Sequence, residues 1–95
     1  MSKVLSTFQG REASENAAKS YERVIVLLKQ ARTSAGLKQY EVADALGVEK
    51  TGISRLESGT YSLSVEKLFV LCELYDIDPE KVIRNALTDF NDLSR

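Results

Sequence analysis

The 95-residue sequence contains no histidine and no tryptophan, and it has only one cysteine and one proline. The absence of histidine removes the imidazole base on which Ser-His-Asp and Cys-His catalysis depends. A single cysteine cannot close an intrachain disulfide, and without a Cys/His cluster no zinc site can form. No stretch reaches the roughly 20 apolar residues of a membrane-spanning helix, and the first residues lack the apolar run of a signal peptide. We therefore expect a small cytoplasmic domain that is not an enzyme and holds no metal or other cofactor.

The charges are almost balanced, with 13 basic and 14 acidic side chains, but they are unevenly distributed. Residues 1–59 carry nine basic and seven acidic side chains, a net charge of +2. Residues 60–95 carry four basic and seven acidic side chains, a net charge of -3. Surfaces that bind nucleic acid are usually basic. The whole-chain balance argues against such a partner, whereas the distribution along the chain leaves it open.

Apolar residues recur at steps of three and four along most of the chain, which is typical of amphipathic helices. Start and stop signals for helices separate these stretches: Ser14, Ser64, Asp78-Pro79, Gly36, Gly47 and Gly59. They predict helices over about 14–34, 39–46, 50–58, 65–75 and 79–93, and no strand pattern of useful length is present. We predict an all-α domain over residues 14–90, with an N-terminal arm at 1–13 and a C-terminal tail at 91–95.

The most informative stretch runs from residue 39 to residue 58, where two short helices are joined by Gly47-Val48-Glu49. This connection is too tight for an antiparallel hairpin but suits a sharp crossing of the two helices. Ala43 lies where the second helix would approach, so a small side chain is needed there. Five apolar side chains are expected to fill the wedge between the helices: Val42, Leu46, Val48, Ile53 and Leu56.

This stretch resembles the Cro/phage-repressor helix-turn-helix family, also called the xenobiotic-response-element family. The resemblance rests on LKQYEVADALGV at residues 37–48 and ISRLESG at residues 53–59, and it extends over roughly 21–82. It implies a compact five-helix, lambda-repressor-like domain whose second and third helices form the helix-turn-helix. It also implies a double-stranded DNA partner, with the third helix in the major groove.

The resemblance assigns DNA contacts residue by residue. The base-contacting positions on the third helix are Lys50, Thr51, Ser54 and Arg55. Arginine and lysine can bond guanine O6 and N7, and a threonine methyl can touch the methyl group of thymine. The backbone-contacting positions are Lys38, Gln39 and Ser58, although Lys38 is equally compatible with an idle surface lysine. The Gln39 amide is also expected to steady a side chain of the third helix. Gly52 is a poor helix former, so its presence indicates either a close approach of the backbone to a base edge or a position where the helix simply tolerates glycine.

A structural ion pair is also implied by the resemblance. The family often pairs an arginine late in the first helix with a glutamate at the end of the third, and Arg32 and Glu57 occupy these positions. Such a pair would hold the recognition helix against the scaffold more than it would add stability, because burial costs both ions their hydration.

Two helices carry more apolar residues than one packed face needs, and excess apolar surface indicates a partner. In the last helix the extra stripe consists of Ile83, Leu87 and Phe90, which we interpret as a homodimer interface. In the first helix Ile25 and Val26 exceed the need, and we expect the arm to cover them. The arm could instead wrap the DNA, although it holds only two basic residues.

The sequence leads us to expect a sequence-specific, double-stranded-DNA-binding transcriptional regulator, a repressor that acts as a homodimer. The chief alternative is a protein-interaction module on the same fold, because a fold alone does not determine function. An antitoxin or anti-repressor of this kind would use the acidic C-terminal third against a basic protein partner.

Overall fold

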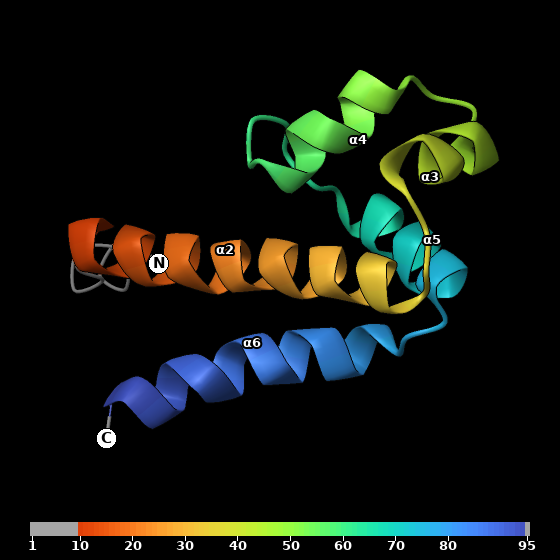
Figure 1. Cartoon of the computed structure of the whole chain (residues 1–95). Coiled ribbons are helices and arrows are strands. Elements are labelled where there is room, and N and C mark those ends of the chain that lie inside the picture. Colours follow the sequence, from red (N-terminus) through yellow and green to blue (C-terminus); the bar gives the residue numbers. More distant parts are fainter. Residues whose placement is uncertain (1–9, 95) are drawn as a thin grey trace.

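The computed structural model describes the backbone of residues 10–94 and the side chains of residues 15–88. It contains five helices, labelled in Figure 1: α2 (Gly10–Ser34), α3 (Gln39–Leu46), α4 (Lys50–Glu57), α5 (Val65–Tyr75) and α6 (Pro79–Ser94). No strand occurs within this part of the chain. The all-α, five-helix prediction is therefore confirmed.

The predicted boundaries differ from the observed ones at the two ends of the domain. Helix α2 begins at Gly10 and not at Ser14, because Arg11, Glu12 and Ala13 tolerate helix well and none of them stops it. Helix α6 ends at Ser94, one residue beyond the predicted end at 93, so residues 91–94 of the predicted tail belong to this helix. Residues 1–9, which make up most of the predicted arm, lie outside the described part of the chain.

Helix α2 is the central element of the fold. It packs against α6 on one side and against α4 and α5 on the other, so that α3 and α4 lie across α2 from α6 (Figure 1). All five helices contribute to one hydrophobic core, which consists of Val24, Leu28, Val42, Ala43, Ile53, Leu56, Leu68, Leu71, Cys72, Tyr75, Val82 and Ala86. This core fixes the position of α3 and α4, the two helices of the predicted helix-turn-helix.

The prediction that Ile25 and Val26 are both surplus apolar residues is wrong for Ile25. The Ile25 side chain is 7% exposed, whereas that of Val26 is 40% exposed. Ile25 borders a small internal space together with Ile53 and Leu56, because α4 packs across this side of α2. Helix α4 thus helps to bury Ile25.

Gly47 makes the turn between α3 and α4 and has a φ of 69°, in the left-handed region. We expect Gly47→Ala to lower the free energy of unfolding by about 1–2 kcal/mol, because a β-carbon strains this conformation. Gly52→Ala is the matched control: Gly52 lies within α4, and a β-carbon there meets no atom within 4 Å. That variant should be more stable by about 1 kcal/mol. Urea denaturation measures both changes. Equal effects of the two substitutions would contradict the left-handed conformation of Gly47.

Candidate nucleic-acid interface

The α3–α4 unit has the geometry of a helix-turn-helix. Gly47 ends α3, and Glu49 stands in extended conformation before the first residue of α4. Val42 and Ala43 are buried where the helices cross, and the Val48 N–H donates to the Ala43 carbonyl at 2.9 Å, which closes the turn. Val48 itself is 39% exposed, so it does not fill the wedge as predicted, although it borders a pocket beside Ile53 and Leu56.

Helix α4 has one buried face and one exposed face. Ile53 and Leu56 are buried in the core. The four predicted base-contacting residues are all exposed: Lys50, Thr51, Ser54 and Arg55. The structure therefore gathers them on the side of α4 that faces away from the protein.

The three predicted backbone-contacting residues lie in different environments. Lys38 is exposed just before α3, and its backbone N–H donates to Glu41 Oε1 at 2.8 Å, so Glu41 supplies the capping interaction. Gln39 is half-buried and its amide points inward, where Nε2 donates to Glu57 Oε1 at 2.9 Å. Ser58 is exposed at the end of α4, and its hydroxyl donates to the Arg55 carbonyl at 3.1 Å.

Arg32 and Glu57 form an ion pair between α2 and α4. Arg32 Nε lies 2.6 Å from Glu57 Oε2, Nη2 donates to Oε1 at 3.2 Å, and Nη1 donates to the Leu37 carbonyl at 2.7 Å. Both side chains are only 9% exposed. Because Gln39 also donates to Glu57, this one carboxylate connects α2, α3 and α4.

Tyr75 is buried, and the charges of both Arg32 and Glu57 affect its pKa. Burial first, and the negative charge of Glu57 second, raise the pKa of Tyr75 to about 12. The phenol therefore stays neutral at physiological pH. It adds no third charge to the buried Arg32–Glu57 pair.

A family model described as helix-turn-helix matches residues 28–82, which is more than half of the chain and includes α3, α4 and α5. The chain belongs to the Cro/phage-repressor helix-turn-helix family. This is the family of phage repressors and XRE-type regulators, and its domain binds DNA. No curated protein matches the chain. No helix within residues 10–94 is long and apolar enough to cross a membrane.

Sequence reasoning missed one residue beside the recognition helix of this Cro/phage-repressor domain. Tyr61 lies in the loop after α4, and its hydroxyl accepts a hydrogen bond from Arg55 Nη1 at 2.9 Å. The Arg55 guanidinium carbon lies 5.6 Å from the centre of the Tyr61 ring. The only signal in the sequence was an aromatic residue two positions after Gly59, which does not indicate a partner by itself.

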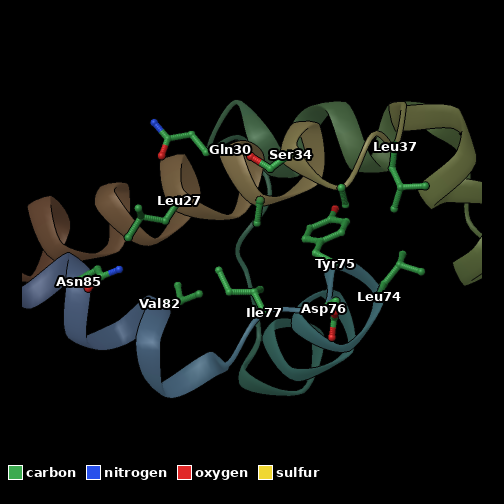
Figure 2. A pocket seen from close by; sticks show the side chains of 12 residues that line it. Leu27, Gln30, Ser34, Leu37, Leu74, Tyr75, Asp76, Ile77, Val82 and Asn85 are labelled. Carbon is green, nitrogen blue, oxygen red and sulfur yellow. The ribbon is translucent and has the colours of Figure 1, made fainter.

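A groove of about 790 Å³ opens between α2, α5 and α6, away from the exposed face of α4. Figure 2 shows that its walls are mainly apolar, with Leu27, Ile77 and Val82 inside and polar Gln30 and Asn85 nearer the rim. None of the predicted DNA-contacting residues lines it. The groove is therefore separate from the candidate nucleic-acid interface.

The Cro/phage-repressor domain also exposes an apolar face on α5 and α6. Val82 and Ala86 point into the core, while Ile83 and Leu87 are exposed on the other side of α6. Phe90, the third residue of the predicted interface, lies outside the residues whose side chains are described. Sequence reasoning missed two further members on α5, which are Val65, 67% exposed, and Phe69, 56% exposed.

Proposed function

We propose that this domain is a sequence-specific transcriptional regulator that inserts α4 into the major groove of double-stranded DNA and acts as a repressor in the form of a homodimer. The observation that carries the proposal is the exposed polar face of α4, which presents Lys50, Thr51, Ser54 and Arg55 opposite a fully packed face. The major groove is about 12 Å wide and accepts a helix of this kind. A rigidly packed helix loses little freedom when it docks.

Phosphate contacts would come from the ends of the helix-turn-helix. Lys38 before α3 is exposed and can donate to a phosphate, whereas the exposed Ser58 hydroxyl would first have to leave the Arg55 carbonyl. Gln39 is committed to Glu57, and its role in the proposal is to hold the end of α4 in place. Glu49 is also exposed, at the start of α4, where its charge opposes the approach of phosphates.

The deciding experiment is selection of duplexes from a random pool with the full chain. The proposal expects enrichment of a defined sequence with two half-sites about 10 base pairs apart, which is the spacing of a symmetric dimer. Recovery of only unrelated sequences would contradict sequence-specific binding. A single, unrepeated half-site would contradict the dimer and leave recognition by α4 standing.

Arg55→Ala should weaken binding to the selected duplex by about 1–3 kcal/mol and relax the preference at one base pair. The physical reason is that arginine bonds guanine with two parallel N–H groups, which alanine cannot replace. Arg84→Ala is the matched control, because Arg84 is also exposed but lies on α6 and pairs with Glu80. Fluorescence anisotropy measures both affinities. Unchanged affinity after Arg55→Ala, and likewise after Lys50→Ala, would show that α4 does not recognise the bases.

The dimer proposal is supported by the exposed apolar face of α5 and α6. Monomeric proteins rarely expose large contiguous apolar patches. We expect Ile83→Asp to raise the dimer dissociation constant by about tenfold or more, because it would bury an unpaired charge in the interface. Thr88→Asp is the control, because Thr88 is exposed on α6 but is not one of the apolar residues of the predicted interface. Sedimentation equilibrium measures the dissociation constants. A monomer well above micromolar concentration for the unmodified chain would contradict the proposal.

A second candidate function is an antitoxin or anti-repressor that uses this face on another protein. A groove of about 510 Å³ is lined by Val65, Phe69 and Ile83, and also by Asp78 and Glu80. Its acidic and apolar lining favours a partner with basic and apolar side chains. Failure of the duplex selection, together with a monomer in sedimentation, would favour this function over the first.

A further inference from the structure

The exposed recognition arginine of α4 is held by an aromatic side chain from the following loop. Arg55 Nη1 donates to the Tyr61 hydroxyl at 2.9 Å, and the guanidinium carbon lies 5.6 Å from the ring centre. The first contact is a hydrogen bond from a charged donor, and the second is within the distance of a cation–π interaction. Tyr61 thus restrains Arg55 in two ways, through its hydroxyl and through its ring.

The loop that carries Tyr61 is itself fixed to two helices. The N–H groups of Thr60 and Tyr61 both donate to the Arg55 carbonyl, at 2.8 and 3.1 Å. From α2, the Tyr21 hydroxyl accepts from the Leu63 N–H at 2.8 Å and donates to the Tyr61 carbonyl at 3.5 Å. The loop therefore has anchors on both sides of Tyr61, and the ring is presented to Arg55 by a backbone that is tied down.

The pairing leaves Arg55 able to bond a base. A guanidinium has five N–H groups, and the contact to Tyr61 uses one on Nη1. Two parallel N–H groups are enough to recognise guanine O6 and N7. A restrained arginine loses less rotational freedom on binding than a free one, so the restraint favours the complex.

We propose that Tyr61 is a positioning residue for base recognition, which orients the Arg55 guanidinium toward the DNA before the complex forms. This inference rests on the proposed function, in which Arg55 contacts a base. Tyr61 acts through Arg55, and its removal should therefore affect one base pair and not the whole site. Tyr21, which holds the loop, contributes to the same positioning from α2.

The test is a double-mutant cycle between Tyr61 and Arg55. Affinity is measured for the duplex recovered by selection and for duplexes changed at the base pair to which Arg55 responds. Tyr61→Phe keeps the ring and loses the hydroxyl, and we expect about threefold weaker binding. Tyr61→Leu loses both contacts, and we expect about tenfold weaker binding. Both variants should also discriminate less at that base pair. In a chain that already carries Arg55→Ala, either change should have no further effect on affinity, because the group that Tyr61 orients is gone.

Tyr40→Phe is the matched control, since it removes a hydroxyl from an exposed tyrosine on α3. Its effect on affinity should add to that of Arg55→Ala, with no coupling. Urea denaturation of each variant shows whether a loss of affinity follows a loss of folded protein. A Tyr61 variant that stays folded but discriminates less at the base pair to which Arg55 responds supports the positioning role of Tyr61.

The outcomes separate this inference from the proposed function. If Arg55→Ala leaves affinity unchanged, or no duplex is recovered, the proposed function fails and the inference fails with it. If Arg55→Ala weakens binding but Tyr61→Phe and Tyr61→Leu do not, only the inference is overturned. It is also overturned if the Tyr61 changes are equally large in the Arg55→Ala chain, or if they strengthen binding, since Tyr61 would then compete with the base for Arg55.

Discussion

Replacing Arg32 by alanine should lower the free energy of unfolding by about 3–5 kcal/mol, the usual cost of removing one partner of a buried ion pair. Arg32 donates three hydrogen bonds, two to Glu57 and one to the Leu37 carbonyl. After the substitution the Glu57 carboxylate would remain buried, while Gln39 still donates to it. Urea denaturation followed by circular dichroism measures the change.

The chain offers a matched control for this substitution. Arg84 also pairs with a glutamate, Glu80, but both side chains are mostly exposed. Exposed pairs contribute about 0–1 kcal/mol, so Arg84→Ala should have a small effect. Arg32→Lys should fall between the two arginine-to-alanine changes, because lysine retains the charge but lacks the planar fork. Similar losses for Arg32→Ala and Arg84→Ala would contradict the role assigned to the buried pair.

A double variant separates the cost of an orphaned charge from the net contribution of the pair. Arg32→Ala combined with Glu57→Ala should cost less than the sum of the two single changes, because each single variant leaves one charge buried alone and the double variant leaves none. A strictly additive result would mean that the two side chains act independently. The same series would show, through DNA affinity, whether the pair orients α4.

Leu71→Ala should lower the free energy of unfolding by about 2–5 kcal/mol. Leu71 lies on α5, is almost completely buried, and borders a small internal space with Leu28 of α2 and with Ile53 and Leu56 of α4. The loss combines reduced burial of apolar surface with an enlarged cavity among helices that cannot all move inward. Because α4 packs on this site, the recognition helix would lose part of its support.

Leu71→Met is the control for the leucine substitution, since it nearly conserves volume and should cost less than about 1.5 kcal/mol. Thermal and urea denaturation of the three proteins give the comparison. The slope of the urea transition should stay constant, which would show that the surface exposed on unfolding is unchanged. A cost below about 1 kcal/mol for Leu71→Ala would mean that the site collapses around the smaller side chain.

The helical content and the two faces of α4 could be predicted from the sequence because they depend on local spacing. Ile53 and Leu56 are three residues apart and define a buried face, which places Lys50, Ser54 and Arg55 elsewhere on the helix. The start of α6 was equally local, because Asp78 and Pro79 form a capping signal. The Asp78 carboxylate accepts from the Glu80 N–H at 2.9 Å. Helix ends without such a signal, as at Gly10, were misplaced.

The sequence by itself determined the fold class, the helix-turn-helix and the side chains that α4 presents, because helical periodicity and turn residues act over a few positions. Only the tertiary structure decided which residues outside α4 contact this helix. Ile25 is buried under α4, and Tyr61 holds Arg55. Each of these contacts depends on how separate helices and a loop pack together, and no local pattern encodes that packing. The near-neutral net charge of the chain therefore says little about its partner. The four polar side chains exposed on one face of α4 say more.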